Sequence, residues 1–370
     1  MNPLINDLLE LSREYGADER YVLLGGGNTS VKDGDTLYVK ASGCSLAEIT
    51  IEGFVKMSLK SLGKMWDASL PEDEGEREKV ILDMMMDARK EGETARPSVE
   101  ALLHALLPER YVVHLHPAII NGLTCSRSAG RGVMTYFPDA LWVPITNPGF
   151  TLATVIRRLQ EKYNREKGKS AQVIFLQNHG VFISADTAEG IRASYQTIME
   201  TLTKALVRRP DFTRVDYPEG DVETMRSALN SVLPPDGKWS FMVNRELIRY
   251  LESYDRSYAI RFSYTPDHIV YSGVAPLWVP SSVLSSQSPA QTIASLIEGF
   301  RQEQGALPKV VLVEKLGAFA NSSRALTLFV DTVKVAVFTE SFGGPLFMER
   351  QYVDFIRDWE VENYRAKVTQ

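Results

Sequence analysis

The chain has 370 residues, which is long enough for two domains that each bury a hydrophobic core. Its formal net charge of -6 and the lack of a concentrated basic stripe argue against nucleic acid as a partner. The first ten residues lack the apolar core of a secretory signal, and no apolar run approaches the length of a membrane span. We therefore expect no membrane partner. The two cysteines, Cys44 and Cys125, form no CxxC motif, so we expect reduced thiols in a cytoplasmic protein.

The first elements are an expected helix over Leu4–Tyr15 and a glycine-rich loop, Gly25–Asn28. Three consecutive glycines let the backbone turn tightly and approach a ligand without obstruction by a Cβ atom. The loop lacks the Gly-Lys-Ser/Thr ending of a Walker A motif and the third glycine of a dinucleotide-binding motif. On the residues alone, the favoured interpretation is a corner between strands, with a turn at Asp33–Asp35 before a strand over Thr36–Lys40.

The next informative stretch is Pro97–Leu107, which predicts a helix. Proline suits the first turn of a helix, and Ser98 can cap its start. Glu100 is therefore expected in the first turn, where a carboxylate is ordinarily explained by the helix dipole. His104 lies four residues further along the same face, and we expect it to support the site or the packing.

Three of the five histidines lie in or directly after two apolar stretches that predict buried strands. Residues two apart on a strand share a face, so the strand that begins at Tyr111 presents His114 and His116 side by side. The second strand, Val173–Leu176, is followed by His179. Three neutral imidazoles suit a divalent metal and leave a coordination position open. The alternative is that His114 and His116 are ordinary core or loop histidines.

The remainder of the chain predicts alternating helices and strands, which is typical of a layered α/β structure. Ser126–Trp142, which contains Tyr136, is expected to be irregular. The proline-bearing segment around Pro234 indicates a boundary between domains 1–233 and 234–370. Helices are expected over Thr151–Tyr163, Asp186–Leu206, Val222–Leu233, Arg245–Glu252, Pro289–Gln304, Ser322–Phe338 and Glu349–Tyr364, and strands around Tyr258–Phe262, His268–Tyr271 and Val310–Val313.

Four blocks, in order, resemble the class II (zinc-dependent) aldolase/adducin family over roughly the first 230 residues. They are Gly25–Lys32, Lys40–Gly43, Pro97–Glu100, and the pair His114-Leu-His116-Pro and Asn178-His179-Gly. The resemblance implies a three-layer α/β/α domain with a central, mostly antiparallel sheet, followed here by a smaller C-terminal α/β domain of unknown role.

The resemblance also implies roles for individual residues. His114, His116 and His179 would bind Zn²⁺ or another divalent metal, and Glu100 would be the catalytic acid/base. Sugar-phosphate aldolases of the family take a catalytic tyrosine from a neighbouring subunit, for which Tyr136 is the nearest candidate. The substrate phosphate would be bound by Gly27, Asn28, Ser42, Gly43 and Ser98. Val99 stands where we expect a second serine, which puts the phosphate on the substrate in doubt.

The implied activity is that of a lyase that cleaves or forms a carbon–carbon bond in a ketose or ketose phosphate through a zinc-stabilised enediolate. Epimerases, dehydratases and decarboxylases share the family's metal, and an adducin-like interaction module without catalysis is a further alternative. The retained histidines and Glu100 argue against the module. A homo-oligomer is expected, because family aldolases commonly assemble with sites at subunit interfaces.

The second half resembles the segment after the aldolase domain in bacterial proteins that fuse a rhamnulose-phosphate-aldolase-like module to a short-chain dehydrogenase. The similar pieces are Tyr264–His268, Ala275–Leu277, Pro308–Leu312, Leu316-Gly317 and Trp359–Asn363. We expect the dehydrogenase to be absent, because no nicotinamide-binding glycine motif is found. The pair Asp267-His268 is assigned no role, since such a pair after a turn is more often structural.

Overall fold

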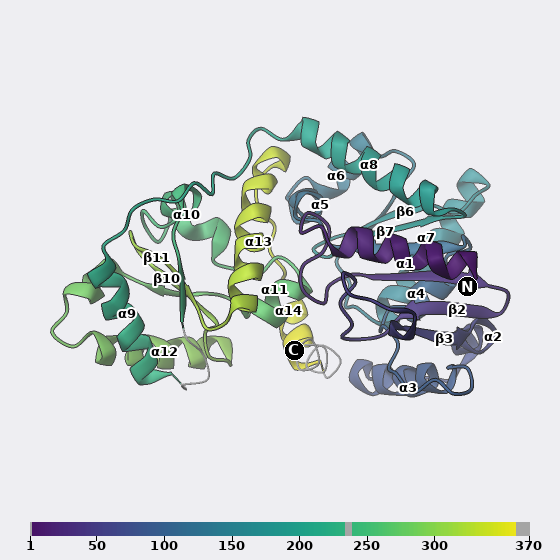
Figure 1. Ribbon diagram of the computed structural model, residues 1–370, viewed down its shortest axis with the longest axis horizontal. Helices are drawn as coiled ribbons and strands as arrows, with labels where there is room; N and C mark the ends of the chain where they lie inside the picture. Colours follow the sequence, from purple (N-terminus) through teal and green to yellow (C-terminus); the bar gives the residue numbers. More distant parts are fainter. Residues whose placement is uncertain (1, 234–238, 360–370) are drawn as a thin grey trace.

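The computed structural model describes residues 2–233 and 239–359, which form two sheets with helices packed on their faces. The two regions lie side by side (Figure 1). The first region contains a seven-stranded sheet in the order β3-β2-β1-β4-β7-β6-β5, antiparallel except for the pair β5–β6. Its strands are β1 (Asn28–Asp33), β2 (Thr36–Lys40), β3 (Phe54–Ser58), β4 (Tyr111–Leu115), β5 (Leu141–Val143), β6 (Val173–Leu176) and β7 (Gly180–Ala185).

Two separate cores cover the two faces of this sheet, which confirms the predicted three-layer arrangement and mostly antiparallel sheet. Side chains alternate along β4, so that Val113 enters one core and Val112 enters the other. One face is covered by α1 (Pro3–Gly16), α5 (Ala118–Thr124), α6 (Ala129–Tyr136) and α8 (Ala188–Ala205). The other face is covered by α2 (Leu59–Gly63), α3 (Glu74–Asp87), α4 (Ala101–Leu106) and α7 (Phe150–Lys167).

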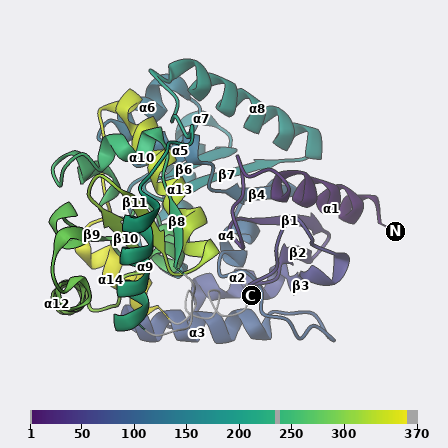
Figure 2. The same ribbon diagram turned by 60° about the vertical axis from the view of Figure 1, so that its left-hand side comes forward.

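The second region is a smaller α/β structure, as predicted, with a four-stranded sheet in the order β8-β11-β10-β9. Its strands are β8 (Ser240–Met242), β9 (Leu277–Val279), β10 (Val310–Val313) and β11 (Gly317–Ala320). One face packs against α9 (Glu219–Val232) and α12 (Pro289–Gln304), which lie beside each other (Figure 2). The other face packs against α10 (Arg245–Tyr250) and α13 (Ser323–Thr339).

Two predicted strands of this region are wrong. Residues Arg256–Ile260 form a 3₁₀ helix, and Pro266–Ser272 form α11. Thr265 caps α11 by accepting a hydrogen bond from the His268 amide, and Pro266 occupies its first turn. All seven residues of α11 are buried, so the sequence shows no polar face and its apolar run resembles a buried strand.

The stretch Ser126–Trp142, expected to be irregular, contains α6 and β5. The helix signal is weak because α6 includes Gly130 and Gly132, and glycine is a poor helix former. Packing explains Gly132, since a Cβ atom there would lie 2.6 Å from Leu123 Cδ1. The C-terminal helix is observed as α14 (Arg350–Asp358), and residues 360–364 of the predicted helix lie outside the described part, as do residues 360–363 of the last similar piece.

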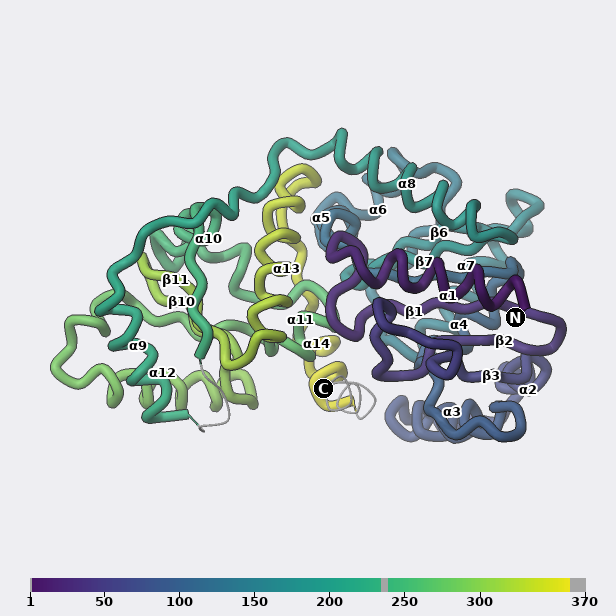
Figure 3. The backbone as a smooth tube through the Cα atoms, in the orientation of Figure 1, coloured from purple at the N-terminus to yellow at the C-terminus, as the bar shows by residue number. Residues whose placement is uncertain are grey.

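The predicted domain boundary falls at residue 234, within the segment 234–238 that lies outside the described residues. A connecting segment leaves α8 and crosses to the second region before α9 begins (Figure 3). Val222, Met225 and Leu229 of α9 belong to the same core as β10 and α12. We propose on this packing that the second region begins before α9. Within the described residues, no helix is both long and apolar enough to cross a lipid bilayer.

The two regions meet where α5 packs against α13 (Figure 1). The approach is close at Gly122, where an added Cβ atom would overlap the Cβ atom of Phe338. The space there is far smaller than van der Waals contact requires, so a larger residue forces the helices to separate.

We expect Gly122→Ala to lower the free energy of unfolding by about 1–3 kcal/mol, because the added methyl group overpacks the contact between α5 and α13. Denaturant titration of the purified chain measures this change. Gly299→Ala is the matched control. Gly299 lies in α12 with no atom within 4 Å of its added Cβ, so alanine there is expected to be neutral or to stabilise by up to about 1 kcal/mol. Equal stability of the two variants would contradict the expected crowding.

Candidate metal centre

The structure brings His114, His116 and His179 together at the end of the first sheet. One ring nitrogen from each histidine can be chosen so that all three lie within 4.8 Å of one another. His114 is on β4, His116 follows the end of that strand, and His179 lies in the turn between β6 and β7. The antiparallel pairing of β4 with β7, with Leu115 opposite Val181, brings the two segments together.

Hydrogen bonds at Nδ1 leave the Nε2 atoms of two histidines facing the cluster. The Nδ1 atom of His114 lies 3.0 Å from the carbonyl oxygen of Val181, and Nδ1 of His116 lies 2.6 Å from Oδ2 of Asp267. We assign the ring proton to Nδ1 in both, because a carbonyl and a carboxylate accept hydrogen bonds. The two Nε2 atoms, 2.9 Å apart, then present lone pairs to the same point. Metal-binding histidines typically use their second nitrogen in this way.

The turn that carries His179 depends on backbone conformations at its neighbours. Asn178 has a φ of 55°, a left-handed conformation that asparagine tolerates better than most residues. A Cβ atom at Gly180 would lie 2.5 Å from the carbonyl oxygen of Leu115 and 2.7 Å from Cδ2 of His116. Burial lowers the pKa of His179 to about 3, so its imidazole is neutral at neutral pH, as a metal ligand must be.

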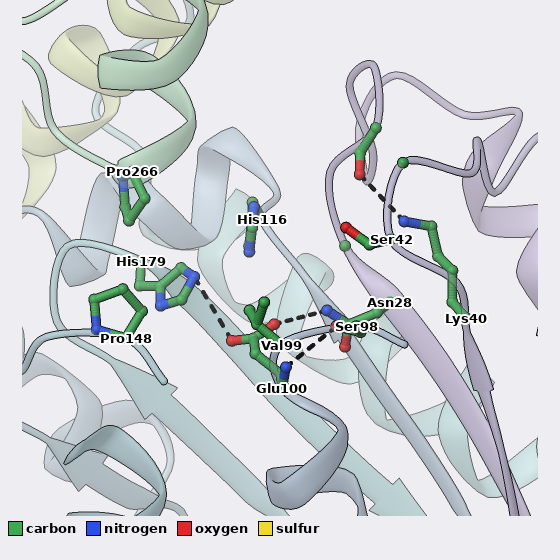
Figure 4. Close-up of a pocket in the computed structure, with 13 residues that line it drawn as sticks. Asn28, Lys40, Ser42, Ser98, Val99, Glu100, His116, Pro148, His179 and Pro266 are labelled. Carbon is green, nitrogen blue, oxygen red and sulfur yellow. Dashed lines mark hydrogen bonds and ion pairs between the residues drawn. The ribbon is translucent and has the colours of Figure 1, made fainter. Parts of the chain in front are cut away.

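Glu100 lies beside the three histidines, as Figure 4 shows for His179. It is the N-cap residue of α4, which begins at Ala101 and not at the expected Pro97, so Glu100 precedes the first turn in which it was expected. Its Oε1 atom lies 3.4 Å from Nε2 of His114 and 3.9 Å from Nε2 of His179, and has no hydrogen-bond partner among the described residues. A buried carboxylate oxygen without a donor is costly unless a cation or substrate satisfies it.

Asn28 and His104 hold the other side of this carboxylate. Asn28 Nδ2 donates to Oε2 of Glu100 at 2.7 Å, and Asn28 Oδ1 is hydrogen-bonded to His104 Nε2. His104 Nδ1 is in turn 2.7 Å from the hydroxyl of Ser30. Burial lowers the pKa of His104 well below its usual value, so its ring is a neutral hydrogen-bonding group. The Asn28 side chain therefore orients Glu100, and His104 orients Asn28.

One pocket beside the metal-binding cluster contains most of the predicted site residues (Figure 4). Its wall opposite the histidines includes a residue that the sequence analysis did not select, Lys40, which is 4% exposed and places Nζ 3.3 Å from the carbonyl oxygen of Gly25. The sequence offered one signal for Lys40, which is the first residue of the block Lys40–Gly43 that resembles the family. The predicted residues that line the pocket are Gly27, Asn28, Ser42, Gly43, Ser98, Glu100, His116 and His179.

Tyr136, the predicted catalytic tyrosine, does not line this pocket. It is the last residue of α6, is 39% exposed, and its ring contacts those of Phe137 and Phe342. Within one chain it therefore lies outside the site, and its role as a residue supplied to a neighbouring subunit stays a prediction.

The second region contributes two neighbours of the site that the sequence analysis assigned no role. Pro266 lines the pocket, and Asp267 is hydrogen-bonded to His116. Both belong to the first turn of α11, a helix in which residues His268–Tyr271 were predicted to form a strand. The pair Asp267-His268 was visible as a polar break in an apolar run, but the partner of Asp267 is 151 residues away and only the tertiary structure brings them together.

The residues present fit a divalent cation. Three imidazoles converge, two of them have their lone pairs directed inward by hydrogen bonds at Nδ1, and an unsatisfied carboxylate oxygen faces the same space. Nitrogen ligands of this kind suit zinc and related transition metals.

Comparison with known proteins gives a family match and a relative of similar sequence. A family described as the class II aldolase and adducin N-terminal domain matches residues 6–205. The Bacillus subtilis (strain 168) protein YuxG, called an uncharacterized oxidoreductase, is 26% identical over 212 residues, which are 54% of this chain and 29% of YuxG. The chain thus spans less than a third of that relative.

Solved structures with a similar fold include two that match about half of the chain. The N-terminal class II aldolase domain of a conserved Thermoplasma acidophilum protein is 27% identical, with 55% of this chain and 94% of that chain covered and a TM-score of 0.47. L-fuculose-1-phosphate aldolase from Thermus thermophilus is 17% identical, with 55% and 92% covered and a TM-score of 0.36. Because the family pattern spans more than half of its residues, this chain belongs to the class II aldolase/adducin family.

Proposed function

We propose that the chain is a metal-dependent aldolase that binds Zn²⁺ through His114, His116 and His179 and acts on a ketose or ketose phosphate. The observation that supports this most is the convergence of the three imidazoles beside the carboxylate of Glu100. An interaction module without catalysis has no need for a buried carboxylate oxygen that lacks a donor. Membership of the family is consistent with an enzyme of this kind.

A bound divalent ion would supply Lewis acidity, polarising a substrate ketone and making the neighbouring carbon more acidic. Glu100 would then move the proton of that carbon. Its Oε2 atom is held by Asn28, whereas Oε1 is directed toward the histidines and free of donors among the described residues, so Oε1 is the atom that accepts the proton. The chain from His104 through Asn28 keeps the carboxylate in this orientation.

The opposite wall of the pocket is suited to a negatively charged end of the substrate. Lys40 provides a buried ammonium group, and Ser42 and Ser98 provide hydroxyl donors. Gly27 and Gly43 have φ values of 68° and 85°, so the backbone at both positions adopts turns in which amide groups can face an anion. We infer that a phosphate or other anionic group of the sugar binds here, although Val99 supplies no hydroxyl.

The substrate-binding wall and the cluster belong to one subunit, but we propose that the enzyme assembles as a homo-oligomer. Tyr136 and Met134 on α6 are 39% and 56% exposed. Large exposed side chains on one helix are suited to contact a second copy of the chain. In such an assembly Tyr136 would reach the site of a neighbouring subunit, which is the role predicted from the family.

The purified chain should bind about one zinc ion, and His179→Ala should lower zinc content at least tenfold because one of three ligands is removed. Elemental analysis after dialysis measures the content, and circular dichroism checks the fold. His268→Gln is the control, because this buried imidazole is hydrogen-bonded to Asp331 and does not belong to the cluster of three histidines. Zinc-free wild-type protein, or full zinc content in His179→Ala, would remove the metal site from the proposal.

Glu100→Gln should retain zinc but lower kcat by about 10²–10⁴-fold, because the amide has the shape of the carboxylate but cannot accept the proton. Exchange of the substrate carbon-bound proton with deuterated water, measured by NMR with a ketose 1-phosphate, reports this step directly. Cleavage and the reverse condensation with an added aldehyde report the carbon–carbon bond. An unchanged exchange rate excludes Glu100 from the mechanism. If no ketose phosphate exchanges or is cleaved, the aldolase proposal fails even with zinc bound.

Lys40→Met should raise KM for a phosphorylated ketose by about tenfold or more, because a charge-assisted hydrogen bond contributes about 1.5–3 kcal/mol. The KM for the unphosphorylated sugar should change little. Lys56→Met is the control, since the Lys56 side chain on β3 is 50% exposed, forms an ion pair with Glu93 and is not among the residues that line the pocket. Equal effects of Lys40→Met on both sugars would argue against an anion subsite at this wall.

A further inference from the structure

We propose that Asp267, from the C-terminal region, is a positioning residue that fixes the tautomer and orientation of His116 for metal binding. This inference rests on the metal site of the proposed function. It also gives the C-terminal region a role, because the first region supplies the three histidines and the second supplies the carboxylate that faces Nδ1 of His116.

His116 is the ligand whose orientation depends most on an outside partner. His114 is on β4, donates through Nδ1 to the Val181 carbonyl of the adjacent strand and is stacked on Phe182, with ring centroids 4.0 Å apart. His116 follows the end of β4. Its Nδ1 atom faces Asp267 Oδ2 at 2.6 Å, a short distance for a hydrogen bond to a charged group. Protonation of Nδ1 places the ring's lone pair on Nε2, where it can bind the ion.

The position of Asp267 is supported by the helix that carries it. It lies in the first turn of α11, which Thr265 caps and Pro266 begins, and its side chain is 9% exposed. The helix packs against α13 and α14. Such support allows a hydrogen-bond partner to restrict the rotation of a metal ligand.

The turn that carries His179 is also joined to the second region. Asn178 Nδ2 donates to the carbonyl oxygens of Tyr264 and Leu346, at 3.1 and 2.8 Å. Two of the three ligands are thus fixed through contacts with residues beyond 260. Metal binding and the docking of the two regions are therefore coupled, and each must strengthen the other by the same free energy.

The test compares zinc affinity in the full-length wild type, Asp267→Ala, Asp267→Asn and Ser272→Ala, by titration against a chelator that competes for zinc. We expect Asp267→Ala to bind zinc about 10–100-fold more weakly, in line with the loss of other hydrogen-bond partners of ligands. Asp267→Asn, which keeps an acceptor oxygen but loses the charge, should give a smaller loss. Ser272→Ala removes the hydroxyl that donates to the Ala325 carbonyl at 2.9 Å, at the opposite end of α11 from Asp267, and should retain wild-type affinity.

A second measurement needs no metal. Side-chain ¹⁵N NMR of the zinc-free protein resolves the tautomer of each histidine, and the chain has only five. The wild type should show His116 protonated at Nδ1, and Asp267→Ala should show a mixture of the two His116 tautomers while His114 remains protonated at Nδ1.

The outcomes separate the two proposals. Wild-type affinity and an unchanged His116 tautomer in Asp267→Ala overturn the role of Asp267 and leave the zinc site standing. Equal weakening in Asp267→Ala and Ser272→Ala also overturns it, because general loosening of α11 would then explain the effect. If the wild type binds no zinc, the proposed function is wrong, and the inference about Asp267 is wrong with it.

Discussion

The antiparallel pairing of β4 with β7 is the constraint on which the site depends. It places His116, one residue beyond β4, against Gly180 at the start of β7. His179 directly precedes Gly180 and therefore lies next to His114 and His116. A slip of one residue would turn His114 from the face that carries Glu100 to the opposite core. The close approach at Gly180 allows the strands to meet without displacing the ring of His116. The geometry of the cluster is therefore set by the register of a sheet whose core lies on both faces.

Around this register, polar groups that would be costly to bury alone support one another. Ser30, His104, Asn28 and Glu100 form a hydrogen-bonded series that ends at a buried carboxylate oxygen with no donor in the described part of the chain. Each group in the series is buried, so its orientation is limited by its neighbours. The terminal oxygen is thus directed toward the cluster, which is the arrangement that the proposed proton transfer needs.

Apart from α6 and β5, much of the first region could be predicted, because its strands and helices have clear periodicity and the three histidines lie in or directly after recognisable strands. The choice of Glu100, Asn28 and the glycine loop as candidate site residues depended on family motifs, since each alone is explained by caps and turns. Two features could not be predicted in this way. The fully buried α11 has no polar face, so periodicity could not separate it from a strand. Asp267 has an ordinary local sequence, and only packing between regions gives it His116 as a neighbour.

The contacts made by Asp267 and Asn178 span long stretches of the chain, 151 residues to His116 and 168 residues to Leu346. During translation, all three histidines leave the ribosome well before the segments that support them. A nascent chain therefore contains its candidate metal-binding histidines before the residues that support two of them, since domains emerge and fold from the N-terminus. The contacts that join the two regions at this cluster can therefore form only after translation has passed Leu346.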